Sequence, residues 1–312
     1  MGENSYTYAV SRIRAKEVSL LDKADIEQLL SASGYEECCH LLADKGFESP
    51  ERERAKIWTL MRELVDDLHP FAVFMIPYDY HNVKAAIKMV YTDDIHAEYL
   101  IPYGLMDSQE ILQAVKDQDF SRLPEPMATA GQAAFKALLH TRNGQLCDVI
   151  LDKAALEAVY AAGKQAKEEF LIQYAELTVA CADMRVAVRG SKTGKSREWI
   201  REALVSCDSL NIDSLADAAA VGVQEIADYL SFTVYSDGAE VLTRSFDEFE
   251  KWCDNRLQEQ VRHERHNAFT IAPLAAYILA RESEIRAVRL ILAGKRNQLS
   301  ESAIRARLRE IG

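Results

Sequence analysis

Apolar residues recur three or four positions apart along most of this chain, which is the pattern of helices that bury one face. The stripe of Ile57, Leu60, Leu64 and Leu68 is typical. Helices are expected at about 10–21, 26–30, 35–45, 51–69, 79–91, 127–142, 245–265, 273–294 and 300–310, with further short helices after residue 196 and through 235. The pattern predicts an all-α fold.

The longest stripe runs from Leu156 to Val188 and is interrupted only at Lys167. It predicts one helix of about 35 residues, or ~50 Å at the usual rise per residue. A helix of that length in a globular protein usually bridges between packed units, so we expect it to act as a brace.

Breaks between helices are expected where glycine, proline and small polar residues gather. The segment 92–126 reads as loop, Asn143-Gly144 as a helix C-terminus, 190–196 as a polar loop and 236–238 as a turn. Such breaks are few, because the 312 residues include only 13 glycines and 7 prolines. The length allows two or three compact units.

A weak internal repeat supports a division into similar units. Residues 21–30 lead through a small-residue break to 34–42, and residues 210–219 lead in the same way to 222–230. Both stretches read as a helix, a turn and a second helix. Duplication is therefore a hypothesis, since helical sequences match one another easily.

The formal net charge of −12 argues against a nucleic-acid partner, which would need a basic face. Arginines and lysines near both ends read as solvated helix faces. No apolar run reaches the ~18–20 residues of a membrane span, and residues 1–5 do not resemble a signal peptide. Membrane contact is therefore expected only through a partner. The six cysteines form no C-x-x-C pair and read as reduced core residues.

The segment 190–196, Gly-Ser-Lys-Thr-Gly-Lys-Ser, imitates a phosphate-binding loop. The first glycine is one residue too close to Gly194 for that motif, and a helix precedes the segment where a strand is required. A basic surface loop is the better interpretation. A nucleotide hydrolase that uses Lys195 is the enzyme alternative.

Candidates for metal or catalytic chemistry are weak. His263-Glu-Arg-His266 has its histidines three apart rather than four, and His81, His96 and His140 stand alone. We therefore expect no catalytic residue, no metal and no cofactor.

Polar residues at helix ends have structural explanations. Asp79 is expected to cap the N-terminus of the helix that starts there. A polar seam between the first and last long helices is also possible. Its members would be Tyr8, Arg12 and Arg14 on the first helix and Tyr277, Glu282, Glu284, Arg286 and Arg289 on the last.

Three motifs in order resemble the C subunit of bacterial and archaeal V/A-type ATPases, a relative of the d subunit of eukaryotic V-ATPases. They are Tyr8-Ala-Val-Ser-Arg-Ile-Arg-Ala-Lys-Glu17 followed by Leu20-Leu21, then Tyr78-Asp-Tyr-His-Asn-Val-Lys84, and the stretch from Pro273 to Arg289. Each motif alone is weak, whereas their order and spacing over nearly the whole chain are fairly specific.

The resemblance implies a funnel of three similar helical units with pseudo-threefold symmetry, here 1–118, 119–205 with the brace helix, and 206–312. It implies a socket at the cytoplasmic mouth of the membrane proteolipid ring, holding central-shaft subunits of the D and F type. No small-molecule ligand is expected. The residues that it assigns to structural motifs are Tyr8, Arg12, Arg14, Glu17, Asp79, Asn82, Lys84, Asp183, Tyr277, Glu284 and Arg289.

One position departs from the family pattern. Val186 stands where the second unit would usually carry an Asn after Asp183, which puts the polar seam of that unit in doubt. The alternative reading is a soluble helical scaffold unrelated to rotary ATPases. Whether the parent machine moves protons or sodium, and whether it hydrolyses or makes ATP, are properties of its other components.

Overall fold

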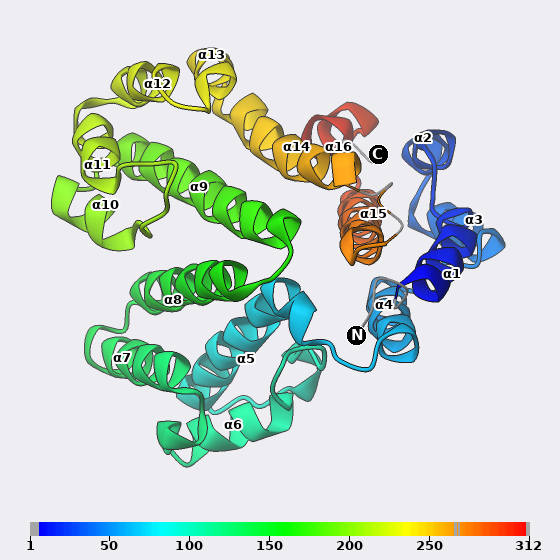
Figure 1. Ribbon diagram of the computed structural model, residues 1–312, viewed down its shortest axis with the longest axis horizontal. Coiled ribbons are helices and arrows are strands. Elements are labelled where there is room, and N and C mark those ends of the chain that lie inside the picture. Colours follow the sequence, from blue (N-terminus) through cyan, green and yellow to red (C-terminus); the bar gives the residue numbers. More distant parts are fainter. Residues whose placement is uncertain (1–5, 265–266, 268, 310–312) are drawn as a thin grey trace. The chain divides into compact units, whose positions relative to one another are not determined.

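The computed structural model describes residues 6–264, 267 and 269–309. Within those ranges every regular element is a helix, as Figure 1 shows. The prediction of an all-α fold is therefore confirmed, while the funnel of three symmetric units stays a prediction. No helix in the described ranges is long and apolar enough to span a membrane.

The chain divides into two compact units, one of residues 1–68 with 254–312 and the other of residues 69–253. Helix α14 contributes to both units. The three units expected from the resemblance are similar repeats along the chain, whereas these two units are compact groups of contacting residues. The three-unit division therefore stays a prediction.

The first unit is built around the last long helix. Its elements are α1 (Thr7–Glu17), α2 (Lys23–Ser31), α3 (Tyr35–Asp44), α4 (Pro50–Leu64), the end of α14 (Phe246–Glu264), α15 (Ala272–Arg296) and α16 (Glu301–Arg307). Helix α15 packs against each of α1, α2, α3, α4 and α16. Its buried stripe of Leu274, Ile278, Ile285 and Val288 supplies the centre of this core.

Local signals explain where these helices begin. Asp22 and Asp25 form a reciprocal capping box at the start of α2. Ser49 caps α4, whose first residue is Pro50, and Ser300 caps α16. Each capping oxygen accepts a hydrogen bond from a free backbone N–H, which fixes the first turn.

The second unit holds the remaining helices. They are η1 (His69–Phe71), α5 (Ala72–Thr92), η2 (Ala97–Tyr99), α6 (Ser108–Lys116), η3 (Phe120–Arg122), α7 (Glu125–Thr141), α8 (Gly144–Gln165), α9 (Glu169–Lys192), α10 (Arg197–Ala203), α11 (Ile212–Val221), α12 (Val223–Ser231), α13 (Ser236–Arg244) and the start of α14. Helix α5 packs against α6, α7 and α8, while α9 packs against α8, α10, α11 and α12.

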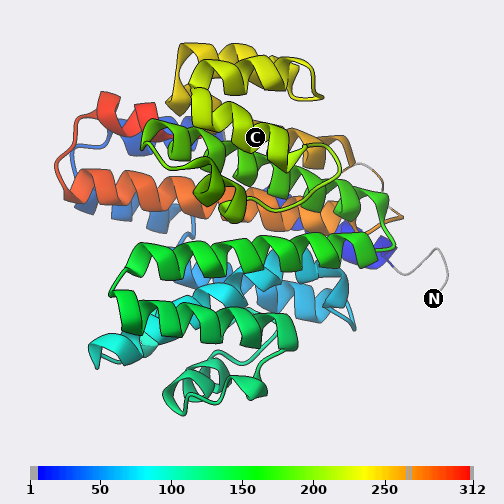
Figure 2. The ribbon, with the colours of Figure 1, turned by 90° about the vertical axis from the view of Figure 1, so that its left-hand side faces the viewer.

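The expected 35-residue brace is wrong, because the stripe belongs to two helices. Ala166 and Glu168 adopt extended ψ angles of 144° and 120°, which separate α8 from α9. The two helices then pack against each other, as Figures 1 and 2 show. At Gly163 an added Cβ would overlap the side chain of Ala175, so the glycine permits this close approach. The polar stretch around Lys167 is the turn of a helical hairpin.

Several expected breaks also differ from the structure. Helix α5 starts at Ala72 rather than near Asp79, and the presumed loop 92–126 contains α6. Helix α7 does end at Thr141, close to where it was expected to end, but Asn143 belongs to the next helix: its side chain caps α8 by accepting from the backbone of Leu146. The presumed turn 236–238 is the first turn of α13.

Candidate functional site: buried polar seats between helices

Buried acids lie in the middle of three long helices, α5, α9 and α15. They are Asp79, Asp183 and Glu284, and all three are almost fully shielded from solvent. A buried carboxyl group is costly unless it is hydrogen-bonded, so the partners of each acid are informative.

Asp79 binds the backbone of the segment that precedes α6. Its carboxylate accepts from the backbone N–H of Leu105 at 2.9 Å and of Met106 at 3.2 Å. The prediction that Asp79 caps its own helix is therefore wrong, because α5 begins seven residues earlier. An added Cβ at Gly104 would overlap the Asp79 carboxylate, so only glycine fits there. Burial raises the pKa of Asp79 to about 6, against the opposing effect of the two N–H donors.

Asn82, one turn along α5, binds the same segment from both ends of its amide. Its Nδ2 donates to the carbonyl of Ile101 at 2.8 Å, and its Oδ1 accepts from the Ile101 N–H at 2.7 Å. Lys84 instead pairs with Asp152 of α8. The predicted motif around residues 79–84 thus positions a loop and joins two helices.

Asp183 repeats the arrangement in α9. Its carboxyl group accepts from the N–H of Val205 at 3.0 and 3.3 Å, just after α10. Burial raises the pKa of Asp183 to about 8. Val186 has no amide to repeat the Asn82 clamp. Glu176 instead accepts from the backbone N–H of Ser209 at 2.8 Å, and the sequence pattern did not point to this residue.

Glu284 of α15 likewise accepts a hydrogen bond from the backbone of a distant segment. Its Oε1 accepts from the N–H of Leu21 at 2.9 Å, and its other oxygen pairs with Arg281. Burial raises the pKa of Glu284 against the effect of Arg281. The Leu21 that carried part of the family resemblance is therefore the residue whose backbone this acid holds.

These three arrangements, which we call loop seats, share a second feature. Each held segment leads into a helix whose N-cap side chain accepts from the backbone. Asp22 caps α2, Asp107 caps α6 and Asn211 caps α11. An acid in a long helix thus fixes the chain before a capped short helix in three places.

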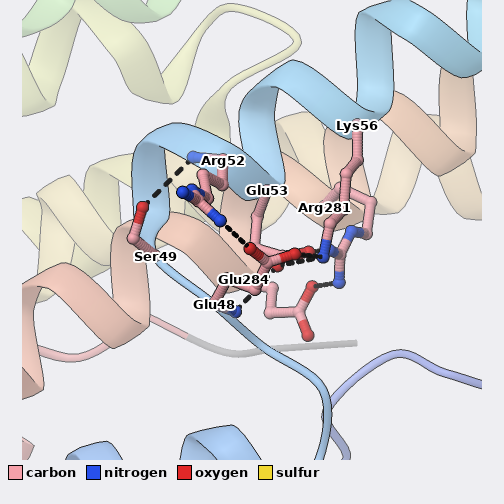
Figure 3. A network of polar contacts seen from close by, with 7 residues as sticks. All are labelled: Glu48, Ser49, Arg52, Glu53, Lys56, Arg281 and Glu284. Atoms are coloured by element: carbon pink, nitrogen blue, oxygen red, sulfur yellow. Dashed lines mark hydrogen bonds and ion pairs between the residues drawn. The ribbon is translucent and has the colours of Figure 1, made fainter.

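A cluster of ion pairs joins α4 to α15 within the first unit, as Figure 3 shows. Buried Arg281 of α15 pairs with Glu53 of α4 and with Glu284. Lys56 Nζ lies 2.8 Å from Glu53 Oε1. Beside this cluster, Arg54 and Glu282 form a bidentate pair at 2.7 and 2.9 Å.

Sequence reasoning named Glu282 and Glu284 but missed Arg54 and Arg281, which pair with them. It also missed Glu53, which pairs with Arg281. A signal was present, because Glu53 stands four residues before Ile57 on the apolar face of its helix. Arg281 likewise lies three residues after the apolar position 278 and four before the apolar position 285. A charged residue in phase with a buried stripe needs a buried partner.

The predicted residues of the first helix lie nearer the surface. Tyr8 is exposed, and its hydroxyl accepts from Arg12 Nη1 at 2.8 Å. Arg14 pairs with Glu17 at 2.7 Å along the same helix. Arg289 of α15, predicted to face the first helix, pairs instead with Glu51 of α4 at 2.6 Å. Helix α15 thus forms several ion pairs with α4.

A cavity of about 420 Å³ brings the two terminal motifs together. Arg12, Leu21, Tyr277, Arg281 and Glu284 are among the residues that line it. Burial raises the pKa of Tyr277, which lies against Arg281 and the acids around it. The family-like residues at both chain ends therefore converge on one place in the first unit.

Residues 190–196, which imitate a phosphate-binding loop, form the end of α9 and its connection to α10. Helix α9 continues through Lys192, and Gly194 follows with φ of +65°, the left-handed conformation common after a helix end. Ser196 then caps the seven-residue α10. Lys195 Nζ lies 5.1 Å above the ring of Trp199. The segment connects two helices instead of following a strand, so its backbone does not form the loop that cradles phosphate.

Groups of His, Cys, Asp and Glu able to hold a metal ion are absent from the residues that the structure describes. The histidine pair falls outside that description, because it includes neither His266 nor the side chain of His263. All six cysteines are free thiols. Cys38, Cys147, Cys181 and Cys253 are buried as expected, whereas Cys39 and Cys207 are only half-buried.

Comparison with known proteins adds an independent finding. Residues 9–307 match the family described as ATP synthase (C/AC39) subunit. The C subunit of the V-type sodium ATPase of Enterococcus hirae is 22% identical, with 96% of each chain covered. The C subunit of the A-type ATP synthase of Methanocaldococcus jannaschii is 23% identical over 97% of this chain and 86% of its own length. The corresponding A-type subunit of Haloquadratum walsbyi is 24% identical, with 96% of each chain covered.

Proposed function

Because this chain belongs to the ATP synthase (C/AC39) subunit family, we propose that it is the non-catalytic central-stalk socket of a V/A-type rotary ATPase. In this role it couples the central shaft, made of D- and F-type subunits, to the proteolipid ring in the membrane. Its place is peripheral, on the cytoplasmic side, and it meets the membrane only through the ring. We propose no nucleic-acid partner and no catalytic residue.

The observation that carries this proposal is the family match across residues 9–307. The match includes the residues of both terminal motifs that converge on the first-unit cavity. The matched relatives are named as subunits of a sodium ATPase and of ATP synthases. A scaffold unrelated to rotary ATPases does not account for a match of that length.

The buried polar contacts suit a part that transmits force. A socket must keep its helices in place when one partner turns against another, and a close-packed interior resists deformation. The three loop seats tie loops to the middle of long helices, and the Arg281 cluster ties α15 to α4. A shift of either helix would leave charged groups buried without partners, at a cost of about 3–5 kcal/mol.

Copurification tests the proposal. We expect the tagged full-length chain to capture both shaft and proteolipid-ring subunits from detergent extracts of the source cells, in fixed proportion. The isolated chain should hydrolyse no ATP, with Lys195→Ala as the control for the nucleotide-loop alternative. Capture of neither kind of subunit would refute the socket role.

A further inference from the structure

The cavity of about 420 Å³ is lined by residues of the first unit alone, from both its N-terminal part and α15. Its volume lies within the range of ~300–1,000 Å³ that is usual for small-molecule sites. Exposed Arg12, Lys16 and Thr59 line it, so the cavity is open to solvent. Buried Leu21 and Phe47 add an apolar wall. A ligand of modest size can therefore enter from outside.

The lining of this cavity is positively charged in a chain that is acidic overall, with a formal net charge of −12. Among the residues that the structure describes, its cationic members outnumber its acidic ones. The cationic members are Arg12, Lys16, Lys45, Lys56 and Arg281, and the acidic members are Glu53, Glu63 and Glu284. A local excess of positive charge attracts anions that the rest of the protein repels. We therefore expect the ligand to be an anion.

Two acids of the lining are already paired within the protein. Glu53 binds Lys56 through one carboxylate oxygen and Arg281 through the other, as Figure 3 shows. Glu284 binds Arg281 through one oxygen and accepts from the backbone N–H of Leu21 through the other. All four carboxylate oxygens are therefore engaged without Arg12 or Lys16.

Arg12 and Lys16 are the cations of the lining that remain without a carboxylate partner in the described part of the chain. Arg12 donates through Nη1 to the hydroxyl of Tyr8, and Lys45 pairs with Asp25. Arg12 and Lys16 stand four residues apart on α1, so they lie on the same side of the helix. Like charges at this spacing repel each other and destabilise a helix. An anion bound between them would offset that repulsion.

Arg281 contributes a buried donor that lacks an acceptor. The residue is 7% exposed, and its Nε has no hydrogen-bond partner in the described ranges, although both Nη groups are paired. Buried donors are almost always satisfied, so an unpaired guanidinium N–H is unusual. It leaves positive potential in the wall of the cavity that the two carboxylate partners do not cancel. This observation is independent of the charges on α1 and favours the same class of ligand.

We propose that this cavity binds a small molecule that carries a phosphate group. The phosphate lies between Arg12 and Lys16, where the planar guanidinium can donate two parallel hydrogen bonds to its oxygens. The hydroxyl of Thr59 is a further donor in the lining. A phosphate carries a charge of about −1.5 to −2 at pH 7, which matches two unpaired cations better than the single charge of a carboxylate does. The inference goes beyond the socket role and does not depend on it, and it departs from the expectation that the chain has no small-molecule ligand.

Calorimetric titration of the purified full-length chain tests the phosphate site. The probes are inorganic phosphate and AMP, with acetate as the carboxylate for comparison, all at the same ionic strength. We expect Arg12→Gln and Lys16→Gln each to weaken phosphate binding by about 10-fold, because each removes a charged hydrogen-bond donor. Glu63→Gln should strengthen binding, since it removes a negative charge from the lining. Arg286→Gln is the matched control, at an exposed arginine of α15 outside the lining, and should leave the affinity unchanged.

The four substituted residues are exposed, so each variant should unfold close to the temperature of wild type. Tighter binding of AMP than of inorganic phosphate would identify a phosphate ester as the ligand, and equal binding would identify free phosphate; both results agree with the proposal. Three results would overturn it: no binding of either probe to wild type, acetate binding as tight as phosphate binding, or equal affinity of wild type and the Arg12 and Lys16 variants. None of these results affects the capture of shaft and ring subunits, which tests the socket role separately.

Discussion

Asp183 shows how a single buried acid can link folding to pH. Its pKa is raised to about 8 by burial, from an ordinary value of 3.8. The folded protein therefore binds a proton at this site more tightly than the unfolded chain does. The stability that the group contributes is complete below about pH 4 and is lost as pH rises through 8.

Replacement of Asp183 by Asn should remove this pH dependence. The amide oxygen can still accept from Val205, and it carries no charge to bury. Between about pH 5 and pH 8, the unfolding free energy of wild type should fall relative to the variant by up to about 1.4 kcal/mol per pH unit. Urea denaturation across that pH range measures the difference. Asp228→Asn, at an exposed acid, is the control, and parallel curves for wild type and Asp183→Asn would contradict the expectation.

Gly104 tests the loop seat of Asp79. Gly104→Ala should destabilise the protein by about 1–3 kcal/mol, because the new methyl group overlaps the carboxylate and displaces it from its backbone donors. Gly144→Ala is the matched control, since its Cβ would meet nothing within 4 Å at the start of α8. Thermal unfolding of both variants gives the comparison. An equal effect of the two substitutions would show that the Asp79 seat contributes nothing.

At the scale of elements, the ion pairs between α4 and α15 should matter more when they are buried. Glu53→Gln should cost about 2–4 kcal/mol of unfolding free energy, because Arg281 then loses one of its two carboxylate partners in the interior. Glu51→Gln, on the same helix, removes an exposed pair with Arg289 and should cost less than about 1 kcal/mol. Chemical denaturation separates them, and similar losses would argue against a special role for the buried cluster.

Helix existence was predictable, but helix connections were not. Stripes such as Leu274 to Val288 identified α15 because a buried face leaves a period in the sequence. The hairpin of α8 and α9 was missed because its two stripes happen to keep phase across Lys167. Asp79 was misassigned to a cap, since its backbone partners lie 26 and 27 residues away. The periodicity of apolar residues predicts single helices, but it does not indicate which distant residues contact one another.

For the candidate site, the sequence likewise identified the residues but not their partners. The motifs named Asp79, Asn82, Asp183 and Glu284, which are all buried polar residues. Their hydrogen-bond partners could not be predicted, because most of the donors are backbone N–H groups, which every residue except proline has and which leave no pattern in the sequence. Val186 did mark a real difference, since α9 has no amide clamp like that of Asn82.

At the scale of the whole molecule, the three loop seats agree with the expected descent from a repeated unit. Each combines a buried acid, a held segment and a capped short helix. Such repetition suits the proposed socket, since similar parts can present similar faces to a ring and to a shaft. The pseudo-threefold funnel remains a prediction of this account.

The central claim is that this chain couples the shaft to the ring, and transport by the reconstituted ATPase with and without it tests that claim most directly. The account predicts that complexes lacking the chain still hydrolyse ATP but lose ATP-driven ion transport, and that adding the purified chain restores it. Ion transport that proceeds equally well without the chain would contradict the account.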